Sequence, residues 1–572
     1  MINIEAAIHN KFPAFANKNA FIRKPTLAFL RKLIREKEIN QFLDDRPGIS
    51  GIDFIDEIFD YFNFSYSVNA NQRRNIPASG RVVIIANHPI GSLDGLALLR
   101  LVSEVRPDVR ILANDMLSSF HALKDLIIPL DNMGSNSARR AYKNTVTALK
   151  NDEAVIVFPA GEVSRARPKG IRDPKWLPGF LNFARRTNSP ILPIRVHAHN
   201  SALFYGASML FKPLGTALLA REMFNKHSHS IHFSVGELIA RKSLESEALT
   251  DRTLVKRLHR HLYKLGKKKK NPTFETLRTI AHPQDRKAIQ AELKKNELIG
   301  QTRDGNRIYL ASCNKDSVLL KEIGRLRELA FRLVGEGTGR RADIDTYDYH
   351  YKHLVLWDQE NLEIAGAYRI GEGEKIIKDK GIEGLYTASL YRYSSEFEDY
   401  AKQGIELGRS FVNPNYWGKA SLDYLWQGIG AYLSKSQHIR YLIGPVSMSA
   451  DYPKELMDML AFFYQRYHSS KHALASAHHP YQIESDHWQA FNAMFENMDR
   501  ISAFEHMQKQ FQERQLKLPV LFKQYAALFE EGGFQALVFS VDPDFGDCLD
   551  GLCMCDITKL KANKAKRYLG NN

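Results

Sequence analysis

The sequence predicts an α/β protein made of two mixed domains, and three observations support this fold class. The chain has 572 residues, which exceeds the size of one ordinary hydrophobic core. Its composition, 44% apolar and 25% charged, is that of a folded globular protein. Two stretches of alternating strand and helix patterns lie on either side of a charged passage at 256–271. We therefore expect four parts: an N-terminal helical region at 1–75, a first α/β domain at 76–265, a linker region at 266–314 and a second mixed domain at 315–572.

The elements follow from hydrophobic periodicity, taken in chain order. Amphipathic helical patterns come first, at 27–43 and 54–62. The first domain shows four apolar strand patterns, at 82–86, 109–113, 154–158 and 191–196, with a helix at 137–149. The second domain shows helices at 318–334 and 420–433, and strands at 353–357, 363–370, 404–412, 441–448, 535–541 and 552–557. Such alternation places functional side chains at strand ends.

Charge and cysteine content limit the class of protein. A net charge of +16 and a pI near 9.4 indicate an anionic partner, which could be nucleic acid, a membrane face or an acidic carrier protein. Four cysteines are too few for a disulfide framework, so we expect a reducing compartment. Aromatic residues are not interleaved with Lys/Arg on a predicted strand, and no recognition helix is evident, so we expect no nucleic acid.

Membrane-spanning segments are not expected. No apolar stretch reaches the ~20 residues needed to cross a bilayer, and 1–19 lacks the apolar core of a secretory signal. The nearest case is the segment 202–220, which Lys212 and Pro213 interrupt. It is either a buried helix-turn segment or a surface that enters the lipid interface.

The first candidate site follows a buried strand. Residues 82–94 read VVIIANHPIGSLD, so His88 emerges in a turn and Asp94 begins the next helix as its expected N-cap. An imidazole at a sheet edge beside a carboxylate is typical of a general base that activates a hydroxyl. Ser92 is not in a Gly-x-Ser-x-Gly elbow, so we do not expect it to be a nucleophile. The alternative is a histidine that only caps the turn.

The second candidate site is the strand 404–412, which reads GIELGRSFV. Strand alternation predicts that Glu406 and Gly408 share one face and that Arg409 points to the other. The turn NYWGKA at 415–420 precedes a helix, and Gly418, Lys419 and Ala420 could offer free backbone N–H groups to a phosphate. The alternative is a routine strand-to-helix connection.

Three blocks of the first domain resemble those of the glycerolipid (lysophospholipid-type) acyltransferases, over about residues 60–240. They are the segment 82–94, FPAGEVSR at 158–165 and SPILPI at 189–194. The resemblance implies that His88 is the general base for an acceptor hydroxyl and that Asp94 fixes its tautomer. It also implies that Glu162 and Arg165 contact the polar head of the acceptor.

Two departures from that family's pattern are typical of its subgroup first labelled hemolysin-like. Five residues lie between His88 and Asp94, one more than in the family's His-x4-Asp pair. Ala160 stands where the family's FPEG block carries Glu. Arg139 and Arg140 are expected to be ordinary helix-surface charges.

The second domain, from 318 to 568, resembles the hemolysin-like and ornithine-acylating branch of the GNAT-type N-acyltransferases, which is related to the autoinducer synthases. The matching pieces are DIDTYD at 343–348, ELGRS at 406–410, LWQGI at 425–429 and VDPDFGDCLDGL at 541–552. The resemblance implies a splayed central sheet in this domain.

By this resemblance Glu406 is the base, direct or through water, that deprotonates an amino acid's α-ammonium. Asp345 and Asp348 would hold the cationic substrate, and Arg409 would support the site or bind the carrier or the substrate carboxylate. The GNAT phosphate turn begins with Arg or Gln, where Asn415 stands here. That change favours an acyl carrier protein, with one phosphodiester, over coenzyme A.

Metal ligands are not expected in this domain. The carboxylates at 343–348 lack the glycine and distal glutamate of a calcium loop. Cys548, Cys553 and Cys555 lack a second CxxC or a paired histidine, so we expect buried thiols.

Together the two halves resemble the bifunctional ornithine lipid synthases. The implied C-terminal reaction transfers a 3-hydroxyacyl group from acyl carrier protein to ornithine, and the N-terminal domain then O-acylates the lyso-aminolipid. No bound cofactor is implied, and acyl-ACP rather than acyl-CoA is the expected donor. The expected location is the cytoplasm, at the anionic inner face of the cytoplasmic membrane. Alternatives are the same chemistry on glycine, lysine, glutamine or a lysophospholipid, and more remotely a nucleic-acid-binding or membrane-lytic protein.

Overall fold

The computed structural model divides the chain into two compact units, Met1–Ala281 and His282–Asn572. It describes residues 4–5, 19–114, 120–130, 135–168, 170–210, 218–219, 221–244, 250–267 and 273–570. Most of the segment 1–19, part of 202–220 and the lysines at 268–270 lie outside these ranges. Among the described residues no helix combines the length and the apolar character needed to cross a membrane.

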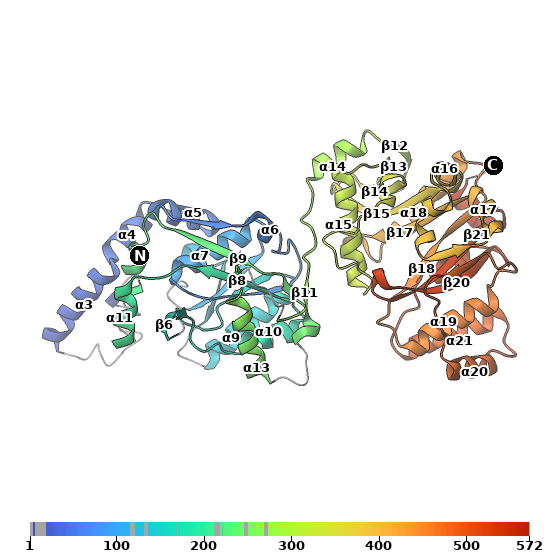
Figure 1. Cartoon of the computed structure of the whole chain (residues 1–572). Coiled ribbons are helices and arrows are strands. Elements are labelled where there is room, and N and C mark those ends of the chain that lie inside the picture. The colour runs from blue at the N-terminus through green and yellow to red at the C-terminus, as the bar shows by residue number, and fades with distance from the viewer. Residues whose placement is uncertain are drawn as a thin grey trace. The chain divides into compact units, whose positions relative to one another are not determined.

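The first unit is built around a mainly parallel sheet with the order β1-β9-β8-β2-β5-β3-β4 (Figure 1). Its central strand β2 (Val82–Ala86) pairs in parallel with β5 and β8, and every β2 side chain is buried. Helices cover both faces, which explains why these strands read as continuous apolar runs. The other strands are β1 (Ser65–Val68), β3 (Val109–Asn114), β4 (Ile127–Leu130), β5 (Ala154–Val157), β6 (Arg165–Arg167), β7 (Gly170–Arg172), β8 (Ile191–His197), β9 (Ser230–Val235), β10 (Leu238–Ile239) and β11 (Thr276–Leu277).

The helices of this unit carry its two apolar core layers. They are α3 (Ala20–Ile34), α4 (Glu36–Asp44), α5 (Gly51–Phe62), α6 (Ala70–Arg73), α7 (Ser92–Ser103), α9 (Ser135–Lys150), α10 (Gly179–Thr187), α11 (Ala202–Leu210) and α13 (Asp251–Leu262). One layer includes Phe54 and Leu98 from α5 and α7, and the other includes Phe180 and Leu258 from α10 and α13.

The second unit contains an eight-stranded sheet with the order β12-β13-β14-β15-β17-β18-β21-β20. All neighbours are antiparallel except β17 and β18, which pair in parallel only at 404–406 and 441–443. The two strands are unpaired beyond this point, so the sheet is splayed as the family resemblance implies. The strands are β12 (Glu297–Gln301), β13 (Arg307–Ser312), β14 (Lys352–Asp358), β15 (Glu363–Glu372), β17 (Gly404–Val412), β18 (Tyr441–Met448), β20 (Phe534–Asp542) and β21 (Cys548–Asp556), and the small sheet β16 (Tyr391–Tyr393) with β19 (Ala475–Ala477).

Helices of the second unit lie against this sheet and extend its core. They are α14 (Arg286–Leu293), α15 (Val318–Leu333), α16 (Gly373–Lys380), α17 (Ser395–Lys402), α18 (Ser421–Lys435), α19 (Lys454–Tyr467), α20 (Ser485–Met494), α21 (Arg500–Glu513), α22 (Val520–Leu528) and α23 (Ala562–Tyr568). The largest buried cluster joins α18, α19 and α21 to the sheet through residues such as Ile429, Leu460 and Phe511.

The mixed α/β fold class is confirmed, and two predicted regions differ in detail. Residues 65–68, expected within the helical region, form β1 and pair with β9. The expected linker at 266–314 contains α14, β12 and β13, and the two strands are part of the eight-stranded sheet. The strands β1 and β12 are short and carry few apolar residues, so their periodic signal is weak.

Candidate active sites

The first site lies where β2 ends and α7 begins. His88 Nδ1 forms an ion pair with Asp94 Oδ1 at 2.8 Å, so the extra residue in the spacing does not separate them. Asp94 is not the N-cap that the sequence predicted. Helix α7 starts at Ser92, and the Asp94 carboxylate reaches back from the third position to accept the Ile90 and Gly91 amides at 2.9 and 3.4 Å.

Electrostatics of the pair favour a basic imidazole. Asp94 is fully buried and His88 keeps 20% of its side chain exposed. Burial alone would lower the pKa of His88, but the adjacent Asp94 carboxylate, with help from Asp173, raises it above 6.5. Because Nδ1 faces Asp94 and no described residue bonds to Nε2, the second ring nitrogen is left to accept a proton.

A second carboxylate, Asp173, fixes the backbone of the turn and was not anticipated from the sequence. It accepts the His88 amide at 3.2 Å, the Ser164 hydroxyl at 2.5 Å and the Trp176 indole N–H at 2.9 Å. Burial raises the pKa of Asp173, and these donors oppose the rise. An aspartate that precedes a proline in a polar loop has no distinctive sequence signal.

The FPAGEVSR segment lies against the histidine, as its place in the resemblance implies. The Phe158 ring stacks on the His88 imidazole with centroids 4.1 Å apart, and the Ser164 amide donates to the His88 carbonyl at 2.7 Å. Arg165 donates to Ser208 of α11 at 2.6 Å and lies 3.9 Å from Glu162. The segment therefore forms one wall beside the imidazole, whereas Arg139 and Arg140 are exposed on α9.

In the second unit, a β-bulge in β17 corrects the predicted alternation. Between two aligned pairs β17 carries one residue more than β15, and Arg409 has a left-handed φ of 49°. The bulge turns Arg409 toward the face of Glu406, and both residues contact Tyr386. Arg409 donates to the Tyr386 hydroxyl at 2.9 Å, while Glu406 accepts the Tyr386 amide at 3.0 Å.

Glu406 is buried and its carboxylate is surrounded by donors. It also accepts the Thr387 amide at 2.8 Å and the hydroxyl of Tyr351. Burial raises the pKa of Glu406, and these donors together with Arg369 act against the rise. The carboxylate thus holds the loop at Tyr386–Ser389, with two donors on Oε2 and one on Oε1.

The DIDTYD segment forms an arginine network (Arg327, Arg369 and Arg409 with Asp343, Asp345 and Asp348). Arg369 contacts both carboxylate oxygens of Asp345 at 2.7 Å, and Arg327 contacts Asp348 at 2.7 Å. Burial alone would raise the pKa of Asp348, but Arg327 and Arg369 hold it below its usual value. Asp345 and Asp348, the carboxylates predicted to hold a cationic substrate, are already paired with arginines.

The predicted phosphate turn is exposed at the start of α18. Gly418 has a left-handed φ of 79°, and Ala420 is the N-cap without a side-chain hydrogen bond. The Lys419 ammonium lies 4.6 Å from the centre of the Tyr416 ring. The Lys419 amide donates to the Tyr416 carbonyl at 3.3 Å, which leaves the amides of Gly418 and Ala420, among the three predicted, for an anion.

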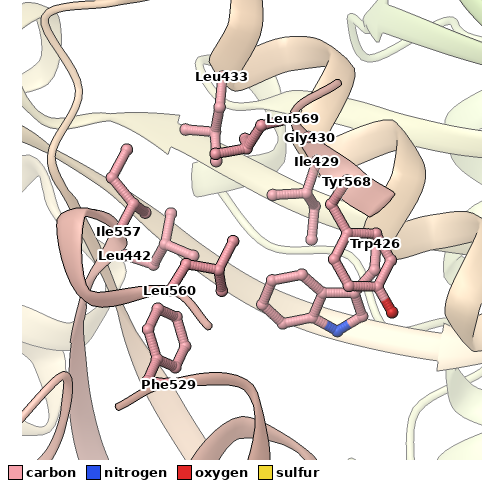
Figure 2. Close-up of a pocket in the computed structure, with 10 residues that line it drawn as sticks. All are labelled: Trp426, Ile429, Gly430, Leu433, Leu442, Phe529, Ile557, Leu560, Tyr568 and Leu569. Carbon is pink, nitrogen blue, oxygen red and sulfur yellow. The ribbon is translucent and has the colours of Figure 1, made fainter. Parts of the chain in front are cut away.

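An apolar pocket lies on the other face of the sheet (Figure 2). Leu442 points into it, whereas its neighbour Ile443 is aligned with Glu406 on the opposite face. The lining residues are Trp426, Ile429, Gly430, Leu433, Leu442, Phe529, Ile557, Leu560, Tyr568 and Leu569. This space belongs to the packing of α18 against α23 rather than to the site around Glu406.

One described group could offer metal ligands: Asp458, Glu484 and His487. Asp458 already accepts His487 Nδ1 at 2.7 Å and the Tyr481 hydroxyl at 2.6 Å, and it pairs with the Lys454 ammonium. A cation in the cluster disfavours a divalent metal. The cysteines at 548, 553 and 555 are buried and free, and burial raises the pKa of each thiol.

Comparison with known proteins assigns both units. Residues 7–267 match the family model described as Acyltransferase, and residues 326–427 match the model described as Acetyltransferase (GNAT) domain. The glycine N(alpha)-acyltransferase of Phocaeicola vulgatus is 31% identical over 51% of this chain and 92% of its own length. The lyso-glycine lipid O-acyltransferase of the same organism is 28% identical over 42% of this chain and 86% of its own length. The L-ornithine N(alpha)-acyltransferase of Agrobacterium fabrum is 30% identical over 24% of this chain and 48% of its own length.

These matches define the class of the protein: a two-domain acyltransferase with homology to N-acyltransferases and to O-acyltransferases. The chain belongs to the acyltransferase family of the Phocaeicola vulgatus N-acyltransferase, and it carries an Acyltransferase domain and a GNAT domain in one polypeptide.

Proposed function

We propose that this protein makes a diacylated aminolipid in two steps, with each unit catalysing one. The GNAT unit transfers a 3-hydroxyacyl group from acyl carrier protein to the α-amine of an amino acid, for which ornithine is our candidate. The other unit then acylates the 3-hydroxyl of that chain. The observation that carries the proposal is the presence, in one chain, of homology to an amino acid N-acyltransferase and to a lysolipid O-acyltransferase.

The O-acylation step is assigned to His88. Its Nε2 accepts the proton of the acceptor hydroxyl as the oxygen attacks the thioester carbonyl. Collapse of the tetrahedral intermediate breaks the C–S bond, and the imidazolium returns the proton to the leaving thiolate. Asp94 stabilises that imidazolium, because its buried carboxylate lies 2.8 Å from Nδ1.

The N-acylation step is assigned to the site around Glu406. An ammonium has no lone pair, so the amine must first lose a proton to a base. The free amine then attacks the thioester and a C–N bond forms. The C–S bond breaks, and the second proton passes from the nitrogen to the leaving thiolate. Glu406 serves as the base, directly or through water, or as a positioning residue that holds the Tyr386 loop by the three hydrogen bonds to its carboxylate.

Acyl carrier protein is the proposed donor, in preference to acyl-CoA. The exposed turn at Gly418, Lys419 and Ala420 suits a single phosphodiester at the start of α18. The net charge of +16 also suits an acidic carrier. No bound cofactor or metal enters either step, since thioester transfer needs a base, positioning and oxyanion donors.

We propose that the protein acts at an anionic membrane surface, on the cytoplasmic side. Leu33 of α3 packs against a small buried cluster that includes Phe204 of α11. Phe21 of α3 (88% exposed) and Met209 of α11 (75% exposed) face solvent, and Lys24, one helical turn after Phe21, is also exposed. Apolar side chains next to lysines suit peripheral binding to anionic lipid.

Glycine is the second candidate head group, favoured by the similarity to glycine N(alpha)-acyltransferases. Purified protein would be incubated on anionic vesicles with 3-hydroxyacyl-ACP, acyl-ACP and each amino acid, and the lipids identified by mass spectrometry. We expect a monoacylated amide followed by a diacylated product. Absence of both amide and ester with every amino acid would reject the proposal.

A further inference from the structure

We propose that the carboxylates of Glu336, Asp542 and Asp550, here called the acidic triad, bind the side-chain ammonium of a diamino-acid substrate in the GNAT unit. The inference rests on the proposed N-acylation of an amino acid. It goes further by naming the residues that would select a cationic acceptor over a neutral one such as glycine.

The triad gathers from three elements at the splayed part of the sheet. Glu336 follows α15, Asp542 ends β20, and Asp550 lies in β21. The Ser447 hydroxyl donates to Glu336 at 2.8 Å, and Ser447 is the registered partner of Asp550. Ser447 lies in the part of β18 that no longer pairs with β17, so the triad lies at the point where the two strands part.

The triad is on the same sheet face as Glu406. Glu406 is aligned with Ile443, and Ile443 and Ser447 are four residues apart on one strand, so they point to the same side. Asp550 is aligned with Ser447 and shares that side. The Tyr386 amide binds Glu406, and burial together with the charges of Asp542 and Asp550 raises the pKa of the Tyr386 hydroxyl.

The buried carboxylate of Asp550, which has no hydrogen-bond donor among the described residues, points to a ligand. Asp550 is only 4% exposed. Asp542 accepts the Asp544 amide at 3.0 Å and Glu336 accepts one hydroxyl, but neither pairs with a lysine or an arginine of the described ranges. Buried carboxylates without a cation are unfavourable, so a cationic ligand would relieve them.

The arginines of the nearby network are already ion-paired with other aspartates. Arg409, whose charge acts on Asp542 and Asp550, forms its own ion pair with Asp343 at 3.0 Å. Burial and mutual repulsion raise the pKa of Asp550 to about 8, and burial raises that of Glu336 to about 7. An ammonium placed among them would lower both pKa values and add charge-assisted hydrogen bonds.

Ornithine and norvaline provide the test, because the two amino acids share a carbon chain and differ by the δ-ammonium. We would measure N-acylation of both by the full-length protein with 3-hydroxyacyl-ACP. The expected kcat/KM for ornithine exceeds that for norvaline by at least ~10-fold, as one charge-assisted contact implies. Asp550→Asn and Glu336→Gln should reduce that ratio by ~10-fold and leave the norvaline rate within ~3-fold. Equal use of ornithine and norvaline, or variants that slow both substrates alike, would overturn the inference.

Asp544→Asn is the matched control, since it removes an exposed carboxylate of the same segment, and it should keep the wild-type ratio. Thermal melting adds a readout that needs no turnover. Ornithine should raise the Tm of the wild-type protein more than norvaline does, and Asp550→Asn should lose the difference. Acylation of glycine with no ornithine-dependent melting shift would preserve N-acylation as the function while removing the diamino-acid site. No acylation of any amino acid would instead reject the function itself.

Discussion

The two sites use buried carboxylates in opposite ways. In the first unit, Asp94 lies against Nδ1 of His88, and Nε2 is the nitrogen proposed to accept the proton of the acceptor hydroxyl. In the second unit, Glu406 accepts three donors from the surrounding fold. The first arrangement suits the proposed general base, while the second holds a loop. A motif residue can therefore be essential in both sites for different physical reasons, and rate, pH dependence and stability respond differently in each.

The largest expected effect tests the first half of this comparison. His88→Ala removes the proposed base, so O-acylation should fall by about 10²- to 10⁴-fold. N-acylation should continue, and the monoacylated aminolipid should accumulate when products are profiled by mass spectrometry. The ring also stacks on Phe158, so a His88→Gln variant and a melting curve would control for lost packing. Continued formation of the diacylated lipid at the wild-type rate would show that His88 is not the base.

A smaller effect, with a distinct pH signature, is expected for Asp94→Asn. The base acts when neutral, so O-acylation rises with pH through the pKa of His88. Burial lowers this pKa and Asp94 raises it to a net value above 6.5, so the ascending limb of the wild-type profile should lie above pH 6.5. Removing the carboxylate should move the limb to lower pH and slow the plateau rate by roughly 10- to 100-fold, because the imidazolium loses its partner. A limb that stays in place would show that Asp94 does not set the pKa of the base.

The sequence predicted the strands and turns that carry the candidate residues better than it predicted the contacts of those residues. The β-branched run before His88 and the turn after it predicted the position of the first site, because a buried parallel strand has a strong local signal. His88 also contacts Asp173 through its amide and Phe158 through its ring. These residues lie 85 and 70 positions along the chain from His88, and no local pattern encodes such contacts.

The second site shows the limit of periodicity. Strict alternation placed Glu406 and Arg409 on opposite faces, and a single extra residue in β17 reversed that prediction. The motif DIDTYD was found, but its pairing with Arg327 and Arg369 could not be read from spacing. The acidic triad was not predicted, although Asp542 and Asp550 lie in the motif at 541–552, because the approach of these two residues to Glu336 depends on how three separate elements pack.

The smallest expected effect separates the two possible roles of Glu406. Tyr351→Phe removes one of its three donors and keeps the ring, so it should lower the free energy of unfolding by about 1 kcal/mol. Glu406→Gln places an amide against the donors, so it should cost about 1–3 kcal/mol and slow N-acylation. If Glu406 only positions the Tyr386 loop, the two variants should change rate and stability in proportion, with an unchanged pH profile. A base would behave differently. Glu406→Gln would remove the titration from the N-acylation profile. Tyr351→Phe would shift the titration to higher pH, because the Tyr351 hydroxyl lowers the pKa of Glu406. Chemical denaturation together with the pH dependence of amide formation therefore decides whether the two sites differ as their hydrogen bonds suggest.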